Sequence, residues 1–179
     1  DFICHPPHID ERPRPGEGAV ALAGRLATDK ARALIEHYPN AVIIGSDQVA
    51  MLDQQILNKP GNFQAAREQL TRCANREVIF HTGLCTIQTR DQHTQTAVES
   101  FSVHFRPLSK QEIENYLLRE EPYDCAGAFK AEGLGISLFR QLSGRDPTTL
   151  IGLPLIALSE MLRNIGINPL LTPPATIQT

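Results

Sequence analysis

The sequence has no apolar run long enough to cross a membrane and no surplus of basic residues. A membrane helix needs about 20 consecutive apolar residues, and no stretch of this chain approaches that length. Its 17 Lys and Arg residues are outnumbered by 20 Asp and Glu, which gives a net charge of -3. Proteins that bind nucleic acid polymers neutralise many phosphates with a basic surface. We therefore predict a cytoplasmic protein that binds neither a membrane nor a nucleic acid polymer.

Motifs that bind zinc through cysteine or histidine are also missing. The four cysteines form no C-x-x-C pair, and the six histidines form no H-x-H or H-x-x-x-H pair. This pattern indicates neither a zinc ribbon, nor a redox motif, nor a histidine metal cage. Ser46 lies in no G-x-S-x-G elbow, which disfavours a serine nucleophile. A small polyphosphate remains a suitable ligand, because a few lysines and one divalent cation can hold it whatever the net charge.

The composition is that of an ordinary globular protein, 41% hydrophobic and 21% charged. The length of 179 residues suits one α/β domain. We expect this domain over residues 1–168 and a flexible tail over 169–179, where Pro and Thr offer no apolar face. Two β-rich segments, 77–88 and 94–106, predict a long antiparallel hairpin. An apolar strand without alternation at 41–44 is typical of a sheet covered on both faces, so we predict a mixed sheet.

The remaining elements are assigned from periodicity, helix caps and turn residues. Asn62 can cap a helix at 63–73. Ser109 and Glu112 form the capping-box pattern of a helix that ends near Arg119. The other expected elements are a first strand at 1–4, a helix at 20–38, a hairpin of 49–52 with 55–57, a strand at 136–142 and a last helix from Pro154 to about Gly166.

The most informative feature is Asp47 in the run Gly45-Ser46-Asp47-Gln48, directly after the expected strand. In open α/β sheets, ligands bind beyond the carboxyl ends of the strands. A carboxylate at this position can therefore meet a substrate or a metal ion. Because Asp is also common in turns, the residues alone support equally well the interpretation that Asp47 only stabilises a turn.

Other charged residues in loops or helices can complete such a site. Glu11 follows Asp10 in a Pro-rich first loop. Lys30 lies in the expected first helix, and Lys59 lies in a turn before a Pro-Gly pair. Each of these alone is more typical of a solvated surface residue. Together the two acids and the two lysines offer two charges of each sign to a metal triphosphate.

Five motifs in order along the chain resemble those of the Maf nucleotide pyrophosphatases. They are Asp10-Glu11-Arg12-Pro13-Arg14-Pro15-Gly16-Glu17, Asp29-Lys30-Ala31, Ile44-Gly45-Ser46-Asp47-Gln48-Val49, Lys59-Pro60-Gly61 and Ile151-Gly152-Leu153-Pro154. The resemblance extends to about Leu170 and implies an α/β domain like those of Maf and ITPase proteins, with an elongated mixed sheet flanked by helices and a cleft between two lobes. It also implies hydrolysis of a nucleoside triphosphate between the α- and β-phosphates, which releases pyrophosphate.

Two further segments resemble the YceF-like branch of that family, which removes 7-methyl-GTP. They are Cys125-Ala126-Gly127-Ala128-Phe129-Lys130-Ala131-Glu132-Gly133 and Gly144-Arg145-Asp146-Pro147. The roles that the resemblance implies are Asp47 as proton acceptor, Glu11 as a carboxylate of the metal and water site, Lys30 and Lys59 as phosphate contacts, and Gln48 and Glu132 as residues that govern base choice.

These implied roles agree with elementary chemistry. A hard divalent cation, Mg²⁺ or Mn²⁺, held by Glu11 and Asp47 would neutralise phosphate charge and help to aim a water molecule. Glu132 can accept hydrogen bonds from guanine and favours the positive charge of a 7-methylated ring, although its residue type alone is typical of a solvated loop acid. Phe129 can stack on the base, but a core position is the more usual place for phenylalanine.

Two alternatives to a 7-methyl-GTP pyrophosphatase remain. One is a nucleotide-binding regulator without turnover, linked to cell division, and the other is a pyrophosphatase for a different non-canonical nucleotide. Maf proteins also begin with a strand, a Ser/Thr-rich turn and an arginine-bearing helix that bind the triphosphate, and no segment of these 179 residues has that pattern. A homodimer is a further expectation from the resemblance.

Overall fold

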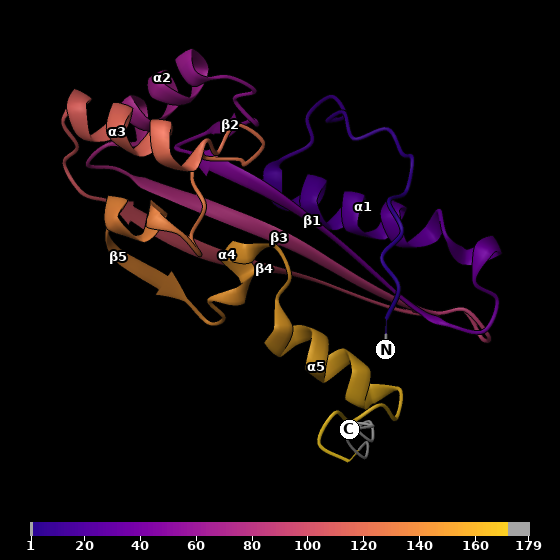
Figure 1. Ribbon diagram of the computed structural model, residues 1–179. Helices are drawn as coiled ribbons and strands as arrows, with labels where there is room; N and C mark the ends of the chain where they lie inside the picture. Colours follow the sequence, from indigo (N-terminus) through magenta and orange to yellow (C-terminus); the bar gives the residue numbers. More distant parts are fainter. Residues whose placement is uncertain (1, 172–179) are drawn as a thin grey trace, which may run out of the picture.

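The computed structural model describes residues 2–171, and its helices and strands alternate along the chain in one α/β domain (Figure 1). The elements are α1 (Ala19–Arg32), η1 (Ile35–His37), β1 (Val42–Leu52), β2 (Gln55–Leu57), α2 (Phe63–Cys73), β3 (Glu77–Gln88), β4 (His93–Phe105), α3 (Lys110–Glu120), η2 (Leu134–Leu138), β5 (Phe139–Gly144), α4 (Thr148–Ile151) and α5 (Leu155–Asn164), where η marks a 3₁₀ turn. The predicted tail at 169–179 lies mostly outside the described residues. Within them, no helix is long and apolar enough to cross a membrane.

The five strands form one sheet in the order β2-β1-β3-β4-β5. Strands β3 and β4 are 12 and 13 residues long and give the molecule its elongated shape (Figure 1). All four strand pairs of the described residues are antiparallel, so the predicted mixed sheet is wrong for this part of the chain. The physical reason is that each strand is joined to its neighbour by a hairpin or a return connection, and antiparallel strands need no crossover helix.

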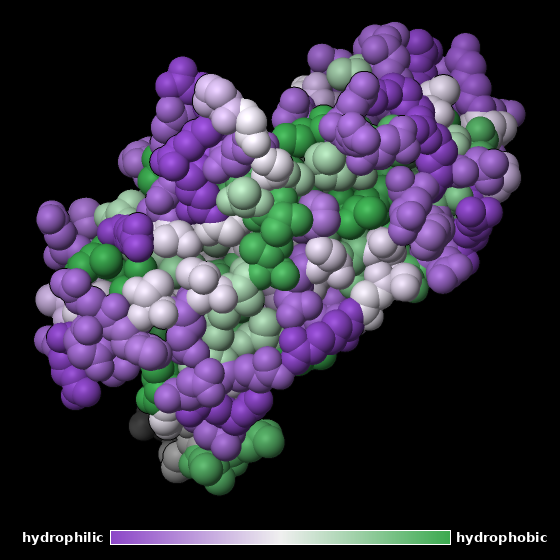
Figure 2. Space-filling model, turned by 180° about the vertical axis from the view of Figure 1, so that it is seen from behind, coloured by the Kyte–Doolittle hydropathy of each residue, from purple (hydrophilic) through white to green (hydrophobic). Residues whose placement is uncertain are grey.

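Helices cover both faces of the sheet, as expected from the resemblance. Helix α1 packs across β1 and β3 on one face, while α4 and α5 pack against β3 on the other. At the β2 end, α2 and α3 enclose the largest core cluster, which includes Leu70, Phe80 and Leu117. A notch separates the lobe of α1 and the first loop from the lobe of α2 and α3 (Figure 2). The predicted cleft between two lobes is therefore present.

Glycines in the sheet let α1 approach it closely. A β-carbon built on Gly45 of β1 would lie 2.2 Å from the Ala27 carbonyl oxygen and 2.9 Å from the Ala31 β-carbon. A β-carbon on Gly83 of β3 would lie 2.1 Å from the Ala23 carbonyl oxygen. Glycine inside a strand commonly marks such a close backbone approach. These two residues thus set the distance between the helix and the sheet.

We expect Gly45→Ala to reduce the free energy of unfolding by about 3 kcal/mol, because the methyl group must displace helix backbone and not a flexible side chain. Chemical denaturation measures this. Gly18→Ala is the control, because no atom of the described residues lies within 4 Å of the position that its new methyl group would take, and its effect should be about 1 kcal/mol or less. Equal effects of the two changes would contradict the role given to the close approach.

The structure confirms the elements that local signals predicted. The Asn62 side chain accepts a hydrogen bond from the Ala65 amide at the start of α2. Ser109 and Glu112 form the expected capping box of α3. Both predicted hairpins, β1 with β2 and β3 with β4, are present. Helix α1 ends at Arg32 and is therefore shorter than predicted, with only a 3₁₀ turn after it.

Three strand predictions are wrong. Residues 2–4 form no strand, and Phe2 is 89% exposed. The predicted strand at 136–142 begins as the turn η2, because Leu138 is buried there in the large core before β5 starts. The strand predicted at 41–44 does not end at Ile44 but continues through Asp47 to Leu52. Gly45 lies inside this strand, where the close approach of α1 requires glycine.

Candidate active site

Asp47 lies in the middle of β1 and faces helix α1. Side chains alternate along a strand, so Asp47 shares its face with Gly45 and Val49, which both contact α1. Its side chain is 12% exposed. Strand β2 pairs only with the last three residues of β1, from Ala50 onward, and leaves the edge beside Asp47 uncovered by β2. The carboxylate is therefore mostly buried but lies at an open edge of the sheet.

Lys30 joins the two predicted acidic residues of the site. It lies in the last turn of α1, and its Nζ is 2.6 Å from Asp47 Oδ1 and 2.9 Å from Glu11 Oε1. The lysine side chain is 22% exposed, whereas Glu11, on the first loop, is 57% exposed. The structure thus brings together three residues that are widely separated in the sequence, and each comes from a different element.

Burial and charge oppose each other in this trio. Burial raises the pKa of Asp47 above the ordinary range of a carboxyl group, and this effect exceeds the attraction of Lys30. Burial by itself would lower the pKa of Lys30, but its bonds to Asp47 and Glu11 outweigh burial and raise it. Lys30 is therefore a cation at neutral pH. With both carboxylates ionised, one lysine is shared by two negative charges.

Lys59 approaches the same site from the other lobe. It is exposed in the loop between β2 and α2, which is fixed by a bond from the Gln69 amide to the Asn58 carbonyl at 3.0 Å. The positive charge of Lys59 acts to lower the pKa of Asp47 and also that of Asp124. Lys59 is thus within electrostatic reach of both acids.

Glu132 is an exposed residue of the loop that follows α3. The Glu120 carboxylate accepts a hydrogen bond from the Leu134 amide at 3.1 Å, and Lys130 Nζ donates to the Glu120 carbonyl at 3.1 Å. These bonds tie the loop to the end of α3. Among the described residues, no hydrogen bond or ion pair joins Glu132 to Asp47. Glu132 is within electrostatic reach of Cys125, and the adjacent Asp124 is within electrostatic reach of Lys59.

Gln48 lies on the opposite face of β1 from Asp47. Its amide nitrogen is 2.7 Å from the Thr149 carbonyl oxygen and 3.1 Å from Thr82 Oγ1, so it holds α4 against the sheet. The hydroxyl of Ser46 is 2.7 Å from the carbonyl oxygens of Gly83 and Gly152. The structure therefore does not bring Gln48 together with the trio. Its predicted role in base choice stays a prediction.

Phe129 is a core residue, which was one of the two interpretations of the sequence. It is 5% exposed, and its ring packs edge to face against Phe80, Phe105 and Phe139, with centroids 5.4, 5.8 and 4.8 Å apart. A ring enclosed in this way has no free face for a base.

The two carboxylates of the trio are oxygen donors of the kind that could hold a divalent cation. Glu11 and Asp47 direct two oxygen atoms at one point, which Lys30 Nζ occupies. Mg²⁺ is usually bound by one or two carboxylates together with water and substrate phosphates. Within residues 2–171 there is no group of three or more His, Cys, Asp or Glu that could hold a metal ion. Among the described residues, the candidate ligands at this point are the carboxylates of Glu11 and Asp47.

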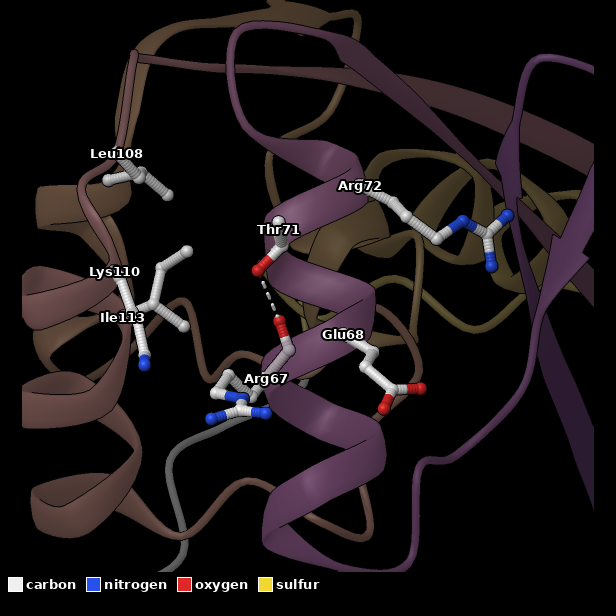
Figure 3. A pocket seen from close by; sticks show the side chains of 7 residues that line it. All are labelled: Arg67, Glu68, Thr71, Arg72, Leu108, Lys110 and Ile113. Atoms are coloured by element: carbon white, nitrogen blue, oxygen red, sulfur yellow. Dashed lines mark hydrogen bonds between the residues drawn. The ribbon is translucent and has the colours of Figure 1, made fainter.

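A separate groove of about 630 Å³ lies between α2 and α3 (Figure 3). It is lined by Arg67, Glu68, Thr71, Arg72, Leu108, Lys110 and Ile113. None of the predicted site residues lines it. Arg67 and Lys110 both pair with Glu114, and Arg72 donates to Gln55, so the basic side chains are largely engaged within the protein. We do not assign the chemistry to this groove.

Sequence reasoning missed Arg25, which lies 13% exposed beneath the first loop and binds Glu17. Glu17 closes the first of the motifs, but nothing local indicates that its partner lies on α1. Four of the five motifs lie on the first loop, α1, β1 and the turn that holds Lys59. These four elements converge at the candidate site. A model of the Maf-like protein family matches residues 1–165, which is most of the chain, and the protein therefore belongs to this family.

Proposed function

We propose that the protein hydrolyses nucleoside triphosphates between the α- and β-phosphates, with 7-methyl-GTP as its substrate. Maf-like proteins are generally nucleotide pyrophosphatases, which supports the reaction class. The single observation that supports the site is the convergence of Glu11 and Asp47 on Lys30 at 2.9 and 2.6 Å. Two acids and a lysine at an open sheet edge, with Lys59 within electrostatic reach, suit a metal-bound triphosphate.

In this proposal Asp47 is the general base. Water attacks the α-phosphorus and loses a proton to the Asp47 carboxylate, while the bond between the α-phosphorus and the bridging oxygen breaks. Pyrophosphate leaves with the electron pair of that bond.

The lysines stabilise the charge that moves onto the leaving group. Lys30 contacts Asp47 directly and Lys59 is within electrostatic reach of it, so both are suitable point charges for phosphate oxygens. A divalent cation held by Glu11 and Asp47 would add Lewis-acid stabilisation of the phosphates. No covalent intermediate on the protein is needed.

The reaction class is tested by product analysis. Purified protein with Mn²⁺ should convert 7-methyl-GTP into 7-methyl-GMP and pyrophosphate, which chromatography separates from the alternative products, 7-methyl-GDP and phosphate. GTP at the same concentration should react more slowly. Binding of 7-methyl-GTP without product would instead support the regulator, and faster reaction of another modified nucleotide would support the third interpretation.

Glu132 carries the proposed preference for the methylated base. We expect Glu132→Gln to reduce kcat/KM for 7-methyl-GTP by about tenfold more than for GTP, because loss of one charge contact to a cationic ring is worth about 1.4 kcal/mol. Steady-state kinetics with both substrates measures the ratio. Glu68→Gln, an exposed change on α2, serves as the control. Equal losses for the two substrates would count against this role.

A further inference from the structure

We propose that Arg25 is a positioning residue that holds the first loop so that the Glu11 carboxylate reaches Lys30 and Asp47. This inference rests on the proposed function, because it gives Glu11 a place in the reaction. Arg25 touches no atom of the trio itself. Its effect on the reaction would pass through the backbone of the loop.

The position of Glu11 depends on how the first loop is attached. Residues 2–18 form no helix or strand, and most of their side chains are exposed. Glu11 itself is 57% exposed, and its ion pair is with Lys30. A flexible attachment would leave this carboxylate free to move, and displacements of about 1 Å in a catalytic group can reduce rates by about 100-fold. Something other than Glu11 must fix the loop.

Arg25 makes four polar contacts that provide this attachment. Its Nε is 2.6 Å from Glu17 Oε1 and its Nη2 is 2.8 Å from Glu17 Oε2, which is a bidentate pair. Nη1 is 3.2 Å from Asp29 Oδ2. Nη2 also donates to the carbonyl oxygen of Arg12 at 3.1 Å. The residue in the last contact, Arg12, directly follows Glu11. We call these four contacts of Arg25 the clamp, and it therefore acts next to the proposed catalytic carboxylate.

The contacts of Arg25 with Glu17 are protected from solvent, unlike the ion pair between Arg12 and Asp10 of the same loop. The side chains of Arg25 and Glu17 are 13% and 10% exposed, whereas those of Arg12 and Asp10 are 87% and 60% exposed. Exposed pairs contribute little to stability, while buried bidentate pairs are stronger and more specific. The bonds from Arg25 also lower the pKa of Glu17 to about 2, so the pair persists at neutral pH.

Helix α1 therefore anchors the loop at two points. Arg25 and Asp29 are one turn apart on the helix, and Lys30 directly follows Asp29. The loop meets the first point through Glu17 and the Arg12 carbonyl, and it meets the second through Glu11. Because the helix is rigid between the two points, fixing the loop at Arg25 restricts where Glu11 can lie at Lys30.

The test is a double-mutant cycle between Arg25 and Glu11. We expect Arg25→Gln to reduce both kcat/KM for 7-methyl-GTP and the Mn²⁺ affinity of the nucleotide-free protein by about tenfold, the lower end of what loss of an orienting partner costs. In an E11Q background the same change should have less than about a twofold effect, because its target is gone. Mn²⁺ binding is read by electron paramagnetic resonance, independently of turnover.

Two controls separate this role from general destabilisation. Arg12→Gln removes only the exposed pair with Asp10 and should change neither quantity by more than about twofold. Arg25→Lys keeps the charge but cannot bind Glu17 bidentately, so it should recover only part of the loss. Hydrogen exchange should show faster exchange of the Arg14 amide, which donates to Glu17 at 2.9 Å, in the Gln variant.

Equal losses from Arg25→Gln in the wild-type and E11Q backgrounds would overturn the proposal, as would no loss in the wild-type background. A wild-type protein that neither binds Mn²⁺ nor releases pyrophosphate would instead refute the proposed function, and with it the role of Glu11. In that case, faster exchange of the Arg14 amide in the Arg25→Gln variant would show that the clamp stabilises the loop but has no part in a reaction. The two failures are therefore distinguishable.

Discussion

Asp47→Asn should reduce kcat for 7-methyl-GTP hydrolysis by about 10³-fold, the middle of the range for loss of a general base. Asparagine has almost the same size as aspartate, so the substrate and the fold keep their shape. It cannot accept the proton of the attacking water. Pyrophosphate release under saturating substrate measures the change, and KM should shift much less than kcat.

The same variant should keep or gain stability, which a structural residue would not. The pKa of Asp47 is raised on folding, so protonation is easier in the folded than in the unfolded state. At pH values below the unfolded-state pKa, Asp47 is protonated in both states and its ionisation does not change the free energy of unfolding. At pH values above the folded-state pKa, Asp47 is ionised in both states, and burying its charge lowers the free energy of unfolding. Asparagine removes this cost at neutral pH.

Thermal unfolding at pH 7 and kinetics together test this assignment. Asp91→Asn is the control, because Asp91 is exposed in the turn between β3 and β4, where it accepts a hydrogen bond from the nearby His93 amide. It should change neither activity nor stability. If Asp47→Asn lowered the melting temperature and left kcat within about tenfold of the wild-type value, Asp47 would be a structural residue and the general-base role would be wrong.

The parts of the fold that were predictable from sequence depend on local contacts. The cap of α2 is a bond between Asn62 and Ala65, three residues apart, and the capping box of α3 spans Ser109 to Glu112. Such helix-capping signals depend only on residues that are a few positions apart in the sequence. The hairpin of β3 and β4 is equally local, because its two strands are separated by a short polar turn.

The parts that failed depend on long-range packing. The apolar run that predicted a strand ends at Ile44, but the strand continues through Gly45, and only the position of α1 shows why glycine is needed there. The same error placed Asp47 after a strand, when it lies within one. Gln48 follows Asp47 directly in sequence, yet the alternation of β1 directs it to the other face, toward Thr149.

The residues alone suggested candidates for the site, and the family pattern assigned their roles. Glu11, Lys30 and Asp47 lie on a loop, a helix and a strand, and no periodicity connects them. Residue type made each of the charged groups look like a solvated surface residue. The order of the motifs grouped them, and the distances to Lys30 Nζ show that three of the grouped residues are in contact. The partnership of Arg25 with Glu17 had no such guide.

Lys30→Met should have opposite effects on metal binding and on turnover. Lys30 Nζ lies where Glu11 and Asp47 direct their oxygen atoms, so a cation that binds there without nucleotide must displace an ammonium group. Methionine keeps a similar length without the charge. We expect the Mn²⁺ affinity of the nucleotide-free protein to rise at least about tenfold, because like charges about 4 Å apart repel by several kcal/mol at a protein surface. Turnover should fall by about 100-fold, since a phosphate contact is lost.

Lys59→Met is the matched control, because it removes one positive charge from the site without removing the ammonium group between Glu11 and Asp47. Lys59 also contributes positive charge to the site, but among the ion pairs of the described residues it has none with Glu11 or Asp47. Its loss should reduce turnover without a tenfold gain in Mn²⁺ affinity. If both variants raised the affinity equally, net charge alone would explain the result. If Lys30→Met lowered the affinity, Glu11 and Asp47 would need the lysine to hold them together, and the exchange of ammonium for metal would be wrong.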